Sequence, residues 1–352
     1  MEINEHISPI HPIGKHYYPL MDWIRYILAL AVIISHTNEL TEFHVPFVLS
    51  SYEAVGGFFA LSGFLMYPNY LAHNNLLKYT RQRARRILPP YILIVVAAGL
   101  SLGLISTLPL SEYYISTDLY KYLAANISFL NWLHPDLPGV FHEAEYRMSA
   151  VNGSLWTMKV EWCLYFSVPV FILILRKIRW IRREWLALTI IILSIAYRVA
   201  FNYLYEITEK EIFNILGRQI IGQLSFFYCG MIVYFHKDFF IKNRLIIFVI
   251  STILYIVYEN CYTLLPILSP IAVTGMVMSV SLQPLNWKWL RHRSNISYEM
   301  YLSHFPIIQL SIYLGLTRTN LITEYSFVLV ATIIFSLASH YCTEAILRKR
   351  SA

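Results

Sequence analysis

Long runs of apolar residues recur along the whole chain, and short polar segments separate them. A helix that crosses a hydrocarbon core of about 30 Å needs about 20 such residues, because an α-helix rises 1.5 Å per residue. Ten runs have about this length: 20–36, 54–71, 87–106, 154–176, 184–204, 212–236, 241–258, 263–282, 296–315 and 322–346. The pattern predicts an all-α fold, a polytopic membrane helix bundle of about ten transmembrane helices.

The composition agrees with this prediction. Hydrophobic residues make up 57% of the 352 residues, charged residues only 14%, and the mean hydropathy is +0.50. A soluble domain usually has about 25% charged residues, so this chain could not cover a soluble surface. The composition therefore excludes an ordinary cytosolic enzyme, a disordered protein and a nucleic-acid-binding module.

Lysine and arginine residues are unevenly distributed between alternate loops. One side of the predicted bundle holds 20 of the 28: Lys15; Lys78, Arg81, Arg83, Arg85 and Arg86; Arg176, Lys177, Arg179, Arg182 and Arg183; Lys237, Lys242 and Arg244; Lys288, Arg291 and Arg293; Arg348, Lys349 and Arg350. The opposite side holds four, which are Lys121, Arg147, Lys210 and Arg318. Four more lie inside predicted spans, namely Arg25, Lys159, Arg198 and Arg218. By the positive-inside rule, both termini are cytoplasmic.

This topology predicts three regions: a cytoplasmic N-terminal segment (1–19), a transmembrane domain (20–346) and a cytoplasmic tail (347–352). It also accounts for the net charge of +7, since the basic loops contact anionic lipid headgroups. We therefore expect a lipid bilayer and no nucleic acid among the partners.

One outer loop, about 107–153, is long enough to suggest a function of its own. Its polar and aromatic candidates are Trp132, His134, Asp136, His142, Glu143 and Glu145. The four cysteines are far apart and form neither a CxxC pair nor a zinc-binding spacing, so no disulfide framework or metal site is expected.

Ionisable side chains inside the hydrocarbon region are costly, and each is a functional candidate. In the first span Arg25 and His36 are eleven residues apart, which is close to three full helical turns, so both point the same way. The helical rise separates them by about 16 Å, with Arg25 near the cytoplasmic face and His36 near the outer end. The alternative is an interfacial ion pair between Asp22 and Arg25, with His36 at a hydrated helix end.

Glu161 in the fourth span lies about 10 Å below the outer face, at a depth similar to that of His36. The two side chains could therefore act as a general base and an orienting carboxylate. The alternative is a structural salt bridge of Glu161 with a basic residue of the outer half: Lys159, Arg198 or Arg218.

Three further features have a structural explanation beside a functional one. Small residues within 56–63 of the second span have the spacing of close helix packing. His304, which falls in the inner half of the ninth span by the same count, is typical of a hydrogen bond between packed helices. The four arginines within 81–86 could clamp the phosphates of a nucleotide-bearing donor, or lipid headgroups.

Together these segments resemble the acyltransferase-3 family of integral membrane acyltransferases. Five matching segments occur in family order: Met21–Tyr26 leading to His36, an Arg-x10-His motif; Phe58–Phe64; Arg83–Pro89; Leu155–Trp162, a Trp-Thr/Ser-x-x-x-Glu pattern; and Ile296–Pro306, similar to an ISYxxYLxHxP stretch. The resemblance covers residues 21–306, which is nearly the whole chain.

The sequence also departs from the family pattern. Trp23 and Tyr26 stand where many members have glycine, and Lys159 stands where serine is common. Bulky groups there would narrow a cavity beside the first helix, so the usual substrate need not carry over. The chain ends soon after the tenth run, which is expected of the stand-alone type without a C-terminal hydrolase-like domain.

The resemblance implies a multi-pass enzyme of the bacterial plasma (inner) membrane. Its donor would be a cytoplasmic acyl-CoA, usually acetyl-CoA, and its acceptor a hydroxyl of an extracytoplasmic polysaccharide or lipid-linked glycan. His36 would be the base or the transient acyl carrier, and Glu161 would orient it. The CoA phosphates would be held by Arg25, Arg83 and Arg86. The supporting residues would be Asp22, Ser62, Trp162 and His304.

Two other functions stay open from the sequence. A transporter or exporter of a glycan or glycolipid intermediate would also have about ten spans with charged residues at depth, although no repeat of two related halves is evident. A catalytically inactive relative could act as an assembly partner, but Arg25, His36 and Glu161 are all present.

Overall fold

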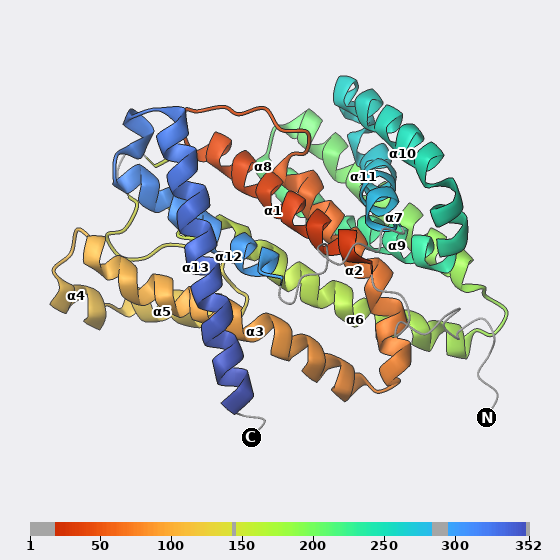
Figure 1. Cartoon of the computed structure of the whole chain (residues 1–352), viewed down its shortest axis with the longest axis horizontal. Coiled ribbons are helices and arrows are strands. Elements are labelled where there is room, and N and C mark those ends of the chain that lie inside the picture. The colour runs from red at the N-terminus through yellow and green to blue at the C-terminus, as the bar shows by residue number, and fades with distance from the viewer. Residues whose placement is uncertain (1–17, 143–145, 284–294, 350–352) are drawn as a thin grey trace. The chain divides into compact units, whose positions relative to one another are not determined.

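Every regular element is a helix in the computed structural model, which describes residues 18–142, 146–283 and 295–349 (Figure 1). The long helices are α1 (Pro19–Leu40), α2 (Ser51–His73), α3 (Leu76–Ser101), α6 (Trp156–Lys177), α7 (Arg183–Thr208), α9 (Ile220–Phe235), α10 (Lys237–Asn260), α11 (Leu265–Ser281), α12 (Ser297–Tyr313) and α13 (Leu321–Lys349). The short ones include α4 (Leu110–Ile115), α5 (Thr117–Ile127), α8 (Glu211–Gly217) and the 3₁₀-helix η3 (Gly153–Leu155). The predicted all-helical membrane fold is confirmed.

Several predicted features lie outside the described residues. They are most of the N-terminal segment, the end of the C-terminal tail, the loop residues Glu143 and Glu145, and the basic residues Lys15, Lys288, Arg291, Arg293 and Arg350.

The chain divides into two compact units. The first unit comprises residues up to 28, 52–79 and 160–293, and the second comprises 29–51, 80–159 and 294–352. Helices α7 to α11 and nearly all of α2 belong to the first unit, whereas α4, α5, α12 and α13 belong to the second. Helices α1, α3 and α6 contribute residues to both.

Each of the ten predicted apolar runs coincides with helix. Within the described residues, seven helical stretches are long and apolar enough to cross a membrane. They are α1, α7, α10 and α13, and three that join a 3₁₀-helix to an α-helix: α3 with η2 (Leu102–Ile105), η3 with α6, and η4 (Tyr262–Leu264) with α11. Helices α9 and α12 have only 16 and 17 residues, and most of their side chains are buried within the protein. A helix enclosed by protein does not itself have to match the thickness of the lipid, so these two are shorter than the spans that the hydropathy pattern predicts.

Three boundaries differ from the predictions. Helix α3 begins at Leu76, so the arginine cluster 81–86 is helical. Arginine has a high intrinsic helix propensity, which favours this earlier start. The predicted sixth span, 212–236, is interrupted between α8 and α9, and Arg218 caps α8 at an exposed position instead of lying within a span. The long outer loop contains two helices, α4 and α5.

In the first unit, α7 packs against α9 and α10 against α11, as Figure 1 shows for the latter pair. Helices α2 and α9 approach backbone to backbone at Gly63 and Gly230. A Cβ atom at Gly63 would lie 1.8 Å from the carbonyl oxygen of Phe227, and one at Gly230 would lie 1.9 Å from that of Ala60. The close packing that was predicted from the small residues of α2 is therefore present.

In the second unit, α12 packs against α13 through buried polar contacts. The Ser303 hydroxyl lies 3.2 Å from that of Ser336, and Ser311 donates a hydrogen bond to Glu324 at 2.5 Å. Hydrogen bonds of this kind join helices where lipid supplies no hydrophobic driving force.

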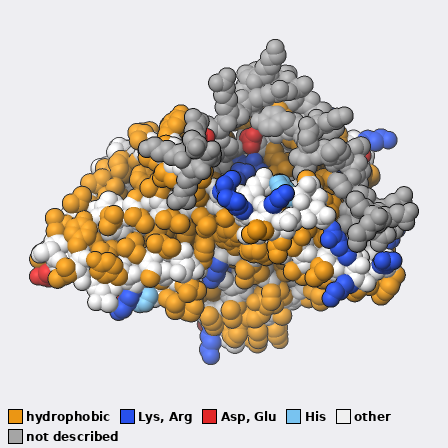
Figure 2. Space-filling model, turned by 90° about the horizontal axis from the view of Figure 1, so that it is seen from below, with side chains coloured by type: hydrophobic (Ala, Val, Ile, Leu, Met, Phe, Trp, Pro, Cys, Tyr) orange, Lys and Arg blue, Asp and Glu red, His pale blue; other side chains and the backbone are white. Residues whose placement is uncertain are grey.

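On the helices that are long and apolar enough to cross a membrane, the exposed side chains are largely apolar. On α10, for example, Leu245, Val249 and Ile253 are all exposed. Among the coloured side-chain classes in Figure 2, hydrophobic side chains cover the largest part of the described surface. This distribution is expected of helices whose solvent is hydrocarbon.

Candidate active site

Two histidines from distant parts of the sequence meet in the second unit. His36 lies near the C-terminal end of α1, and His304 lies in the middle of α12. The Nδ1 atom of His36 is 2.7 Å from the Nε2 atom of His304, and the two rings stack with centroids 5.1 Å apart. His304 is fully buried, whereas His36 is half-buried, so part of the surface of His36 stays exposed.

The contacts of His304 indicate which nitrogen of His36 carries the proton. The Nδ1 atom of His304 lies 3.3 Å from the carbonyl oxygen of Met300, which can only accept, so this nitrogen is the donor. In a neutral ring the Nε2 atom of His304 must then accept, and it accepts from Nδ1–H of His36. The Nε2 atom of His36 is left with a lone pair, and no described residue is hydrogen-bonded to it. A lone pair of this kind is what a general base needs.

Hydrogen bonds join the part of α12 around His304 to the segment that leads into α6. The Tyr301 hydroxyl lies 2.8 Å from that of Thr157 and donates to the carbonyl oxygen of Ser154. Asn152 donates to the carbonyl oxygen of Leu302 at 2.7 Å. The edge of the Phe305 ring meets His36 at a centroid distance of 5.6 Å. Residues 152–157 thus fix the position of α12 around His304.

The prediction that His304 lies deeper than His36 is wrong, since the two rings are in contact. Depth was counted along a span assumed to run straight between the two membrane faces. Helix α12 has only 17 residues, about 25 Å by helical rise, so its ends do not define those faces. Tyr301 and Phe305 were parts of the predicted motif, but the sequence did not indicate which histidine they surround.

Glu161 lies on the part of α6 that belongs to the first unit, where it accepts a hydrogen bond from the Tyr165 hydroxyl. The pairing of Glu161 with His36 therefore stays a prediction. Among the described residues, Arg198 and Arg218 form no ion pair with Glu161, so these two forms of the alternative salt bridge are not realised. Trp162 stacks on Phe166 with ring centroids 5.8 Å apart.

The predicted donor-binding arginines are divided between the units. In the first unit Arg25 donates to Asp22 at 2.9 Å, as the alternative interpretation expected, and Ser62 is half-buried on α2. In the second unit Arg83 is buried and Arg86 is exposed, and both lie on α3. These roles also stay predictions.

Helix α12 connects the α3 arginines to the histidine pair within the second unit. The Tyr298 hydroxyl donates to the carbonyl oxygen of Ile87, the residue after Arg86, at 3.2 Å. Tyr298 precedes His304 by six residues, which is about 9 Å along the helix. Helix α12 thus runs from a contact beside Arg86 to the histidine pair.

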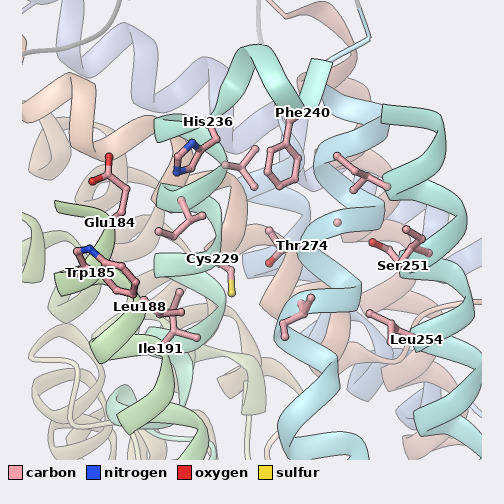
Figure 3. Close-up of a pocket in the computed structure, with 16 residues that line it drawn as sticks. Glu184, Trp185, Leu188, Ile191, Cys229, His236, Phe240, Ser251, Leu254 and Thr274 are labelled. Carbon is pink, nitrogen blue, oxygen red and sulfur yellow. The ribbon is translucent and has the colours of Figure 1, made fainter. Parts of the chain in front are cut away.

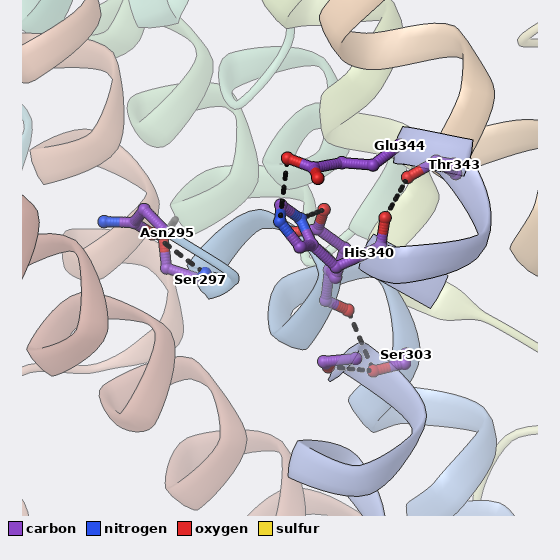
Figure 4. A network of polar contacts seen from close by, with 8 residues as sticks. Asn295, Ser297, Ser303, His340, Thr343 and Glu344 are labelled. Atoms are coloured by element: carbon purple, nitrogen blue, oxygen red, sulfur yellow. Dashed lines mark hydrogen bonds and ion pairs between the residues drawn. The ribbon is translucent and has the colours of Figure 1, made fainter. Parts of the chain in front are cut away.

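A second polar cluster joins α12 and α13 in the same unit (Figure 4). His340 lies between two carboxylates, with Nδ1 at 3.1 Å from Glu299 and Nε2 at 3.6 Å from Glu344. The Ser303 hydroxyl donates to the backbone carbonyl of Glu299. No sequence motif drew attention to His340. No group of His, Cys, Asp and Glu side chains among the described residues, this cluster included, could hold a metal ion.

The first unit contains an apolar cavity of about 540 Å³. It is lined by α7, α9, α10 and α11, and Figure 3 shows Leu188 and Ile191 on one wall with Ser251 and Leu254 on the other. Its polar lining is sparse, and it contains none of the predicted site residues.

The comparison with known protein families shows to which family the chain belongs. The acyltransferase-3 family profile, described as an acyltransferase domain, matches residues 18–341. The chain belongs to the acyltransferase-3 family. It is therefore a multi-pass membrane acyltransferase, as the ordered motifs predicted.

Two relatives of this acyltransferase extend over most of its length. A protein named O-acetyl transferase, from Shigella phage Sf6, is 25% identical over 315 residues, which is 84% of this chain and 86% of that protein. A protein named nodulation protein 10, from Rhizobium leguminosarum bv. viciae, is 23% identical over 323 residues, or 84% of each chain. No solved structure matches the acyltransferase.

Proposed function

We propose that this acyltransferase is an O-acetyltransferase of the plasma membrane. It moves an acetyl group from cytoplasmic acetyl-CoA to a hydroxyl of an extracytoplasmic polysaccharide or lipid-linked glycan. The family and the name of the phage relative support the acetyl transfer. The observation that carries the proposal is the contact of His36 with His304, because it leaves the His36 Nε2 atom unprotonated.

The donor enters from the side on which most basic residues are predicted to lie. Arg83 and Arg86, with Arg25, hold the CoA phosphates, since guanidinium groups bind phosphate oxygens through paired hydrogen bonds. The pantetheine arm extends along α12, which leads from the contact of Tyr298 with α3 to His304. The thioester thereby reaches the accessible side of His36.

In the chemical step, His36 Nε2 removes the proton of the acceptor hydroxyl while its oxygen attacks the thioester carbonyl. The tetrahedral intermediate then expels the CoA thiolate, which takes the proton from the His36 imidazolium. His304 accepts the hydrogen bond from Nδ1–H throughout, so it orients the ring. The role of Glu161 in this proposal is the one that the resemblance implies, which is to orient His36 or stabilise its imidazolium.

The test uses a strain that lacks the gene and carries either the wild-type protein or a variant. We expect His36→Ala to reach the membrane in normal amount and to remove the acetyl signals from the nuclear magnetic resonance spectrum of the surface glycan. His44→Ala, at an exposed position outside the site, is the matched control and should acetylate normally. Full acetylation by His36→Ala would refute its role as the base. Accumulation of unmodified cytoplasmic precursor in the deletion strain would indicate an exporter instead.

A further inference from the structure

The first unit contains a buried cation that has no carboxylate partner among the described residues. Arg198, on α7, is only 5% exposed. Its Nη2 atom donates to the Ser269 hydroxyl at 2.9 Å, whereas its buried Nη1 atom has no hydrogen-bond partner among the described residues. No ion pair within the described part of the chain includes Arg198. Burial of a guanidinium group is costly unless an anion compensates it.

A second cation faces the same aromatic ring. The guanidinium carbon of Arg198 lies 5.6 Å from the centroid of the Tyr52 ring, and that of Arg218 lies 5.3 Å from it. Phe226 supports Arg198 on another side at 5.1 Å. Arg218 is exposed, Tyr52 is half-buried and Arg198 is buried, so the three form a path from the surface inwards. Ring contacts partly stabilise each cation, but two like charges beside one ring repel each other and favour a bound anion.

The apolar cavity of the first unit lies along the same face of α7. Ile191 lines the cavity and precedes Arg198 by seven residues, which is close to two helical turns. The two side chains therefore point the same way, about 10 Å apart along the helix. On α11, Ser269, which accepts a hydrogen bond from Arg198, lies two residues before Ile271 and five before Thr274, and both of these line the cavity. The apolar cavity, part of whose lining Figure 3 shows, therefore lies about two helical turns from Arg198 along α7.

We propose that Arg198 and Arg218 bind the phosphate group of a membrane lipid whose hydrocarbon chain lies in this cavity. Two guanidinium groups suit phosphate, which offers several acceptor oxygens and at least one full negative charge. The lipid comes from the side opposite to the basic loops, because Arg198 follows Arg183 by 15 residues, or about 22 Å, along α7.

Two lipids carry this chemistry. One is an anionic phospholipid of the bilayer. The other is a lipid-linked sugar, and only that choice rests on the proposed acetyl transfer to such an acceptor. A purely structural role, in which the rings of Tyr52 and Phe226 alone stabilise Arg198, is the alternative that the experiment must exclude.

The experiment measures lipid binding by the purified full-length protein in detergent, by native mass spectrometry and without acetyl-CoA. The probes are phosphatidylglycerol, phosphatidylcholine and farnesyl diphosphate. The variant Arg218→Gln changes an exposed residue, so the fold should persist. Lys210→Gln, an exposed residue at the start of α8, is the matched control for loss of one positive charge. Leu188→Trp fills the cavity from its wall.

We expect the wild-type protein to retain an anionic lipid, and Arg218→Gln to bind it about tenfold more weakly, as for loss of one charge-assisted hydrogen bond. Leu188→Trp should weaken lipid binding as well, and Lys210→Gln should leave it unchanged. Preference for phosphatidylglycerol identifies a bilayer phospholipid, and preference for farnesyl diphosphate identifies a lipid-linked sugar. Equal binding by wild type, Arg218→Gln and Leu188→Trp, or no binding to any probe, would overturn the proposal. Because the readout needs no acetyl transfer, failure here leaves the proposed activity untouched.

Discussion

At the scale of single residues, the chemistry of the candidate site depends on the position of one proton. The carbonyl group of Met300 determines the tautomer of His304, and His304 in turn determines that of His36. His304 is thus a positioning residue for the base. Its burial and its stacking against His36 hold the two rings in one arrangement.

Replacement of His304 tests this role. We expect His304→Leu to lower kcat about 100-fold while the KM for acetyl-CoA stays unchanged, because the Nδ1–H of His36 loses its acceptor and the ring loses its orientation. His304→Gln should restore much of the rate, since its amide oxygen can accept the same hydrogen bond. Kinetics of the purified enzyme would measure both. If the two variants were equally inactive, packing and not hydrogen bonding would be the function of His304.

Arg86 offers a separate test of the donor site. It is exposed on α3, so Arg86→Gln should leave the fold intact. We expect the KM for acetyl-CoA to rise about tenfold, since one charge-assisted hydrogen bond to a phosphate is lost. Arg81→Gln, also exposed and about one turn earlier on the same helix, is the control for a general loss of charge. An equal rise of KM in both variants would indicate a diffuse electrostatic effect instead of a defined phosphate contact.

At the scale of helices, close packing limits which residues the core of the first unit tolerates. Gly63 and Gly230 let the backbones of α2 and α9 touch, and Phe226 lies against Gly56 of α2. A side chain larger than hydrogen at the crossing would separate two helices of the first unit. The small residues of the second predicted span are therefore explained by packing.

Gly63→Ala should destabilise the protein. The added methyl group would lie 1.8 Å from the Phe227 carbonyl oxygen, which is backbone and cannot rotate away. Forced overpacking of this kind costs about 1–3 kcal/mol, and we expect a lower melting temperature in detergent. Ser62→Ala, the neighbouring half-buried position, is the control and should melt close to wild type. A wild-type melting temperature for Gly63→Ala would mean that α2 and α9 are less tightly packed than the structure indicates.

At the scale of the whole molecule, the distribution of lysine and arginine predicts the orientation in the membrane. We expect a variant that keeps Cys261 as its single cysteine to react with a membrane-impermeant maleimide in intact cells, because Cys261 is exposed after α10 on the predicted outer side. In a cysteine-free background, Arg179→Cys should react only after permeabilisation, since Arg179 lies between α6 and α7 on the predicted cytoplasmic side. The reverse labelling pattern would invert the topology and move the donor site to the other face.

The sequence alone was sufficient to predict the helices and the family. Hydropathy is local, and a helix in lipid must satisfy its backbone hydrogen bonds within itself, so each apolar run predicted one helical region. The family motifs are also contiguous stretches, and the family profile confirms them over residues 18–341. Interruptions such as the one at Arg218 escaped prediction because the polar stretch Gly217–Gln219 is short and apolar residues flank it on both sides.

Which polar residues meet was decided only by the tertiary structure. His36 and His304 are 268 residues apart, and their contact depends on the short length and burial of α12, which no count along the sequence supplies. The same holds for Arg198 and Arg218, which face one tyrosine ring although they lie on separate elements of the first unit. Periodicity indicates which way a side chain points from its own helix, whereas its partner depends on how the helices pack.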